Sequence, residues 1–133
     1  MRLLCVSLTV ALAAASGGCS KSPKEVEKEA RQTAASWAAT LSAGAERWGS
    51  GELSTSYFNT VVTQARTSLD KQEKSVKKSA GDRAAAPLEA VASHVDVIAD
   101  AVKRGDRTAA INAGHAAASE VPAEKTPAVA RPQ

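Results

Sequence analysis

Aromatic residues and cysteines are scarce in this chain of 133 residues. Only 3% of the residues are aromatic, whereas 29 are alanine, which is the best helix former and a poor strand former. This composition argues against a β-sandwich or a β-barrel. The two cysteines are too few for a disulfide-stapled small domain or for a zinc site with four cysteine ligands. The length suits one small domain.

Recognisable catalytic spacings are missing as well. The sequence contains no G-x-S-x-G, H-E-x-x-H, C-x-x-C, P-loop or G-x-G-x-x-G segment. Its 17 basic and 14 acidic side chains are mixed along the chain, which gives a formal charge of +3 and no concentrated basic patch. We therefore expect neither an enzyme nor a nucleic-acid-binding protein, and we predict no catalytic residue, cofactor or resident metal.

The first 18 residues have the features of a secretory signal peptide. Arg2 supplies one positive charge, and residues 3–15 form an uncharged run that is too short to span a bilayer. The small residues that follow end in Ser16-Gly17-Gly18-Cys19, which resembles the lipobox of bacterial lipoprotein precursors, with Ser16 where that family usually has Leu. The resemblance implies cleavage before Cys19 and lipidation of Cys19, with palmitate among the acyl chains.

Two other interpretations of the amino terminus stay open at this point, namely ordinary cleavage after Ala15 and an uncut anchor helix. In the lipoprotein interpretation, two or three acyl chains hold the protein at a membrane almost permanently. Ser20 follows the lipidated cysteine, and by resemblance to Gram-negative lipoproteins this favours the outer membrane, facing the periplasm. Lys21 and Lys24 either attract anionic headgroups or belong to the solvated start of a helix.

Apolar residues recur at steps of three and four from residue 23 to about residue 120, which predicts amphipathic helices. Four such segments with short links predict an all-α, up-and-down four-helix bundle over residues 23–120; a three-helix bundle with a loosely docked fourth segment is the alternative. Residues 19–22 form a short linker to the bundle, and residues 121–133, which hold three prolines, are predicted to be a disordered tail. The predicted helices run from Pro23 to about Gly49, from Ser54 to Gly81, from a first turn that holds Pro87 to Arg104, and from Arg107 to about Glu120.

One face of each predicted helix supplies the core. On the outer face of the second predicted helix, the sequence predicts ion pairs between Asp70 and Lys74 and between Glu73 and Lys77. In both pairs the acid precedes the base by four residues, which is the favourable order. The predicted core stripes of the first three helices are Val26, Ala30, Thr33, Trp37, Leu41, Gly44 and Trp48; Phe58, Val61, Val62, Ala65, Leu69 and Val76; and Leu88, Val91, Val95, Ile98 and Val102.

The four aromatic residues are unevenly distributed, because Trp37, Trp48, Tyr57 and Phe58 fall within 22 positions. Such residues either fill an alanine-rich core or form a patch that binds a partner. The two histidines, His94 and His115, fall on the third and fourth helices, where antiparallel packing would allow them to meet at a weak metal site. Ordinary surface or boundary positions are the commoner role for such histidines.

The sequence thus predicts a lipid-anchored, non-enzymatic helical lipoprotein of the cell envelope that binds or scaffolds an envelope protein. The alternative is a periplasmic lipoprotein that binds a ligand or a metal in the bundle interior or at the His94/His115 pair.

Overall fold

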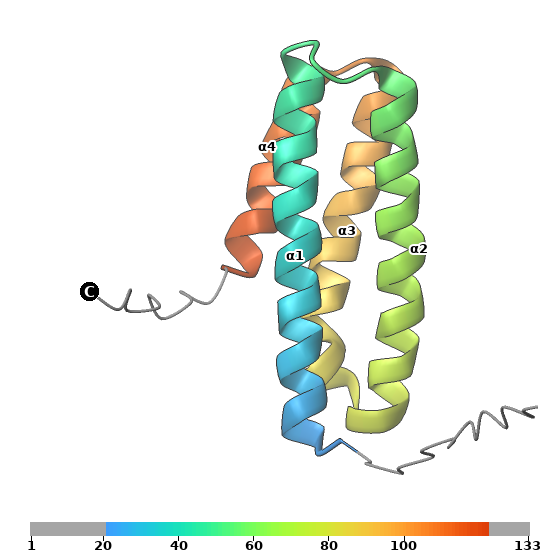
Figure 1. The fold of residues 1–133 in the computed structure, drawn as a ribbon, viewed down its shortest axis with the longest axis vertical. Coiled ribbons are helices and arrows are strands. Elements are labelled where there is room, and N and C mark those ends of the chain that lie inside the picture. The colour runs from blue at the N-terminus through green and yellow to red at the C-terminus, as the bar shows by residue number, and fades with distance from the viewer. Residues whose placement is uncertain (1–20, 123–133) are drawn as a thin grey trace, which may run out of the picture.

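The computed structural model describes residues 21–122 and confirms the four-helix bundle. The elements are α1 (Pro23–Gly49), α2 (Thr55–Ala80), α3 (Asp82–Arg104) and α4 (Arg107–Glu120). Successive helices run in opposite directions, so the start of α1 and the α2–α3 turn lie at one end of the bundle (Figure 1). Helices α2 and α4 each pack against both α1 and α3, and α1 also contacts α3.

Polar side chains begin three of the helices. Ser22 accepts a hydrogen bond from the Glu25 amide, and the Glu25 carboxylate accepts one from the Ser22 amide, which forms a capping box. Ser54 caps α2 by accepting from an amide of its first turn, and Asp106 caps α4 in the same way. These side chains satisfy amides that have no partner within a helix, so the local sequence fixes where α1, α2 and α4 begin.

The start of α3 differs from the prediction. Pro87 was expected in the first turn, but α3 begins at Asp82 and contains Pro87 in its interior. The chain passes from α2 to α3 through Gly81 alone, whose φ of 87° is a conformation that glycine adopts without strain. Proline has no amide hydrogen, so α3 lacks the hydrogen bond that residue 87 would donate to the Arg83 carbonyl. This missing bond lies close to the start of the helix, where the first amides have no partner within the helix.

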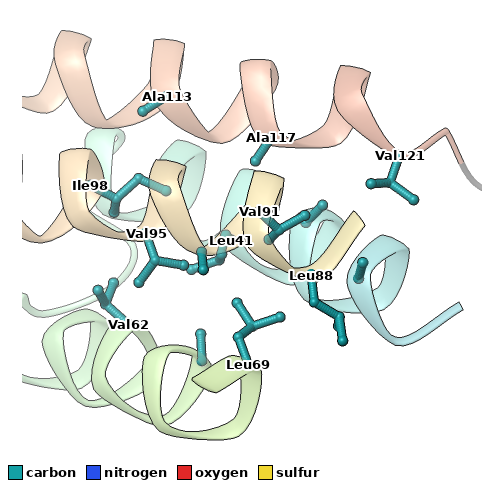
Figure 2. Close-up of a cluster of buried hydrophobic side chains, with 14 of the residues drawn as sticks. Leu41, Val62, Leu69, Leu88, Val91, Val95, Ile98, Ala113, Ala117 and Val121 are labelled. Carbon is teal, nitrogen blue, oxygen red and sulfur yellow. The ribbon is translucent and has the colours of Figure 1, made fainter. Parts of the chain in front are cut away.

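The core stripes of α2 and α3 are confirmed. Every predicted residue of the α3 stripe is buried, and so are the predicted residues of α2 except Val61, which is half-buried. Leu69 of α2 and Leu88 of α3 point toward one another in the core (Figure 2). Because these side chains supply most of the large apolar groups, the α2–α3 pair carries most of the hydrophobic stabilisation.

The predicted stripe of α1 is confirmed at Ala30, Leu41, Gly44 and Trp48, but it differs in the middle of the helix. Ala34 and Ala38 are fully buried, whereas the predicted Thr33 and Trp37 are half-buried at the edge. Helix α1 packs against all three other helices, and alanine leaves room for their backbones to come close. The periodic pattern favoured the bulkier residues, but the crowded centre of the bundle accommodates the smaller ones.

Helix α4 packs through small residues. Its buried positions are Ala110, Ala113, Gly114 and Ala117, and Ile111 is half-buried. Val121 follows α4 and is also buried, so the bundle continues one residue into the segment predicted to be a tail. The rest of that segment, residues 123–133, lies outside the described residues, as do the predicted signal peptide and Cys19.

Candidate functional site

A groove lies beside α4 because that helix is much shorter than its neighbours. Helix α4 has 14 residues, whereas α1 has 27 and α3 has 23. At a rise of about 1.5 Å per residue, α4 covers only part of the face that α1 and α3 present to it. The uncovered part is a groove of about 700 Å³ below the end of α4, where α4 stops part-way along α1 (Figure 1).

The groove has an apolar floor and a charged rim. Ala86, Pro87 and Ala90 of α3 supply the floor, and Val121 lines it where the chain leaves α4. The rim carries charges from three helices. Helix α1 contributes Glu27 and Arg31, whose side chains form an ion pair of 3.3 Å. Helix α3 contributes Arg83, and α4 contributes Glu120. An apolar trough bordered by both charge signs is suited to bind a peptide segment, since it offers burial and several polar partners.

The two histidines lie at different seams of α4. His115 on α4 places its Nε2 atom 2.5 Å from the Glu46 carboxylate of α1. His94 on α3 places its Nε2 atom 3.6 Å from the Glu120 carboxylate of α4. Within residues 21–122, no three His, Cys, Asp or Glu side chains come together as a metal-binding group. Each histidine therefore makes one contact between α4 and a neighbouring helix, and the two contacts lie at separate places.

Two of the four aromatic residues are in the core. Trp48 is 3% exposed and Phe58 is fully buried, and their rings stack with centroids 5.7 Å apart. The indole Nε1 of Trp48 donates to the Thr55 hydroxyl at 3.1 Å, and the Arg107 guanidinium lies 6.0 Å from the indole centroid. This cluster joins α1, α2 and the start of α4 at the end of the bundle that is remote from residue 21.

The other two aromatic residues are accessible to different degrees. Trp37 is half-buried between α1 and α2, and its Nε1 atom donates to the Ser68 hydroxyl at 3.2 Å. Tyr57 is 60% exposed, next in sequence to the buried Phe58. The aromatic residues thus form no continuous surface patch, and Tyr57 is the one of the four whose side chain is largely free to touch a partner.

Charged side chains stay at the surface. Over residues 21–122 no polar or charged residue is classed as buried, and no buried side-chain polar atom lacks a hydrogen-bond partner. The predicted pair between Glu73 and Lys77 forms at 2.6 Å, but Asp70 pairs with Arg66 of its own helix instead of with Lys74.

One charged cluster links the lower parts of α2 and α3. The Lys77 ammonium group lies between the Glu73 and Glu89 carboxylates. The hydrogen bonds that it donates to Glu73 and Glu89 raise the pKa of Lys77 above its ordinary value of 10.5. The hydrogen bond from Lys77, reinforced by its positive charge, lowers the pKa of Glu89 below its ordinary value of 4.5. This cluster favours the folded chain when all three groups are charged.

We expect Glu89→Gln to reduce the loss of folding stability that the protein undergoes when the pH is lowered. A carboxyl whose pKa is lower in the folded state stabilises that state above its unfolded pKa, and this stability is lost as the pH falls below about 4.5. Urea unfolding at pH 6 and pH 3 measures the difference, which should be smaller in the variant than in the parent. Glu52→Gln is the control, because Glu52 is an exposed partner of Arg47 in the first loop. Equal pH differences in parent and Glu89→Gln would contradict the assignment.

The sequence located the aromatic and histidine positions but did not locate the groove. The signal for it was present, because the fourth predicted segment is much shorter than the others and a short fourth helix leaves one corner of a bundle open. No helix in the described part of the chain is long and apolar enough to cross a bilayer. Comparisons with protein-family models, with curated proteins and with solved structures give no match to this chain.

Proposed function

We propose that this protein is a lipid-anchored lipoprotein of the cell envelope that binds or scaffolds an envelope protein and catalyses no reaction. The anchor is the lipid on Cys19, and the binding module is the four-helix bundle. The proposal places the lipoprotein at the outer membrane, facing the periplasm, if the cell is Gram-negative.

The observation that carries the proposal is the spacing between Cys19 and the bundle. The small residues Ser16-Gly17-Gly18 precede Cys19, and α1 begins at Pro23, four residues later. A span of four residues reaches at most about 14 Å, so a lipid on Cys19 would hold the start of α1 close to the membrane. A folded module directly after a lipidated cysteine is well placed to hold a partner at the bilayer.

The groove beside α4 supports the binding half of the proposal. It is an open corner of the four-helix bundle, and it offers an apolar floor with charges of both signs at its edge. An amphipathic helix that lies in line with α4 would cover the floor formed by Ala86, Pro87 and Ala90. Such a helix would complete the fourth corner of the bundle, which is a known mode of helix-in-groove recognition.

The anchor is tested by Cys19→Ser. In the parent we expect the protein in the membrane fraction, with an intact mass that shows cleavage before Cys19 and the addition of acyl chains. In the variant we expect no acylation and no cleavage at that bond, so that only the uncut precursor and no mature form is found in the membrane fraction. A crosslinker applied to the parent membranes should give one specific adduct that is absent in the variant.

Cys5→Ser is the matched control for this experiment. Cys5 lies in the segment that is removed, so its replacement leaves the mass and location of the mature protein unchanged. A mature Cys19→Ser protein that is cut at the same bond and retained in the membrane would overturn the anchor. Membranes that yield no specific adduct, although the protein is acylated, would overturn the scaffolding role and leave the anchor intact.

A further inference from the structure

We propose that the end of the bundle at which α1 begins is a docking surface for anionic lipid headgroups. The inference rests on the proposed lipid anchor for the place where it acts, but the surface itself is defined by charge. Five exposed cations make up this basic end: Lys24 and Lys28 of α1, Lys74 and Lys78 of α2, and Arg83 of α3.

The basic end is visible only in the fold. Its members lie up to 59 positions apart in sequence, with acidic residues between them, and for that reason the sequence showed no concentrated basic patch. The up-and-down topology brings the start of α1, the end of α2 and the start of α3 to the same end (Figure 1). Lysines and an arginine from three helices therefore share one surface.

Charge is distributed unequally along the bundle. The segments 21–33 and 71–90, nearest the basic end, hold nine lysines and arginines against six aspartates and glutamates. The segments 34–70 and 91–122, in the other half, hold five against seven. The domain is close to neutral as a whole, so this difference gives it one positive and one negative end. A charged membrane would orient such a molecule.

The cations of the basic end are also available to a ligand. Within residues 21–122, none of the five has a carboxylate within ion-pair distance. Four of the six acids in this half pair with other cations, and Glu25 and Asp82 form no ion pair with a described residue. Glu29 binds Lys21, Glu27 binds Arg31, and both Glu73 and Glu89 bind Lys77. The amino-terminal ends of α1 and α3 lie at this end too, together with the carboxyl-terminal end of α2, so two positive dipole ends outweigh one negative dipole end.

The position of the anchor selects lipid as the partner. Lys24 lies five residues after Cys19, so an acylated Cys19 would hold Lys24 within about 18 Å of the headgroups, which is less than the Debye length of about 30 Å at low salt. Each lysine or arginine at an anionic surface strengthens binding about fivefold. The bundle then stands with its axis away from the membrane, its far end faces the aqueous space, and the groove, which shares Arg83 with the basic end, opens at the side of the bundle near the headgroups.

The test compares two double variants that remove the same charge from opposite ends. Lys24→Gln with Lys78→Gln reduces the basic end, and Lys103→Gln with Arg104→Gln reduces the far end of α3. The mature protein is purified from cells and reconstituted in phosphatidylcholine vesicles with or without 30% phosphatidylglycerol. Hydrogen exchange of backbone amides is measured at low and high salt, and thermal melting checks that both variants are folded.

We expect amides of residues 22–28 and 76–86 to exchange more slowly on anionic vesicles than on neutral ones, at low salt only. The basic-end variant should lose this protection, because two missing cations lower the contact constant about 25-fold. The far-end variant should keep it. Equal exchange on the two kinds of vesicle, or equal loss in the two variants, would overturn the docking surface.

The intact mass of the purified mature protein shows whether Cys19 is acylated, and this tests the proposed anchor separately from the docking surface. If the mature protein lacks acyl chains, the anchor fails, and the same proteins are compared by co-sedimentation with the same vesicles. The basic-end variant should then bind anionic vesicles about 25-fold more weakly than the far-end variant. If both bind equally, the docking surface fails as well.

Discussion

Phe58→Ala should destabilise the bundle by about 3–5 kcal/mol, the usual cost of removing a buried aromatic side chain. The Phe58 ring is fully buried, stacks on Trp48, and lies over Gly44 of α1. An added Cβ atom at Gly44 would stand 2.7 Å from the Phe58 ring, so the ring occupies the space that a side chain would take. Alanine leaves a cavity there that neither α1 nor α2 fills without moving.

Urea unfolding followed by circular dichroism measures this loss. A domain of this size has a total stability of about 5–15 kcal/mol, so the variant should unfold at a much lower midpoint or be partly unfolded without denaturant. Tyr57→Ala is the matched control, since Tyr57 is the neighbouring aromatic residue and is 60% exposed. We expect the control to change stability by about 0.5 kcal/mol or less. Similar losses in the two variants would contradict the burial pattern.

The sequence predicted most of the fold because its signals are local. Periodicity placed four helices, and Ser22, Ser54 and Asp106 mark three of the helix starts through short-range hydrogen bonds. The core of α3 followed directly from its alternating steps of three and four. The predicted start of α3 was wrong, because proline is favoured in the first turn of a helix. The sequence does not show that Gly81 alone connects α2 to α3.

The features of the candidate site depend on contacts between helices, and the sequence does not contain these in readable form. Trp37 shares the periodic stripe of α1, yet Ala38 takes the central position because three helices crowd that face. The basic end gathers side chains from three helices, and the groove results from a difference in helix length. The predicted partner of Asp70, Lys74, was also wrong. The guanidinium of Arg66, one turn before Asp70 on α2, pairs with the Asp70 carboxylate instead.

Gly114→Leu should displace α4 from α1, with a loss of about 1–3 kcal/mol that falls mainly on α4. A Cβ atom at Gly114 would lie 3.0 Å from the Cα atom of Ser42 and 3.4 Å from the Cβ atom of Ala45. The first of these neighbours is backbone, which a side-chain rotation does not relieve. Leucine adds three further carbon atoms, so the two helices have to separate. Gly114→Ala should be almost neutral, because the gain in helix propensity of about 1 kcal/mol offsets the closer contact.

Hydrogen exchange at residues 107–120 gives the readout for this substitution. In the leucine variant these amides should exchange much faster than in the parent, while the amides of α2 should change less, since α2 does not pack on α4. Asn112→Leu is the matched control, because Asn112 is an exposed residue of the same helix. If the amides of α4 exchange equally slowly in both leucine variants, the assigned close contact between α4 and α1 is wrong. The groove defined by the end of α4 would then be wrong as well.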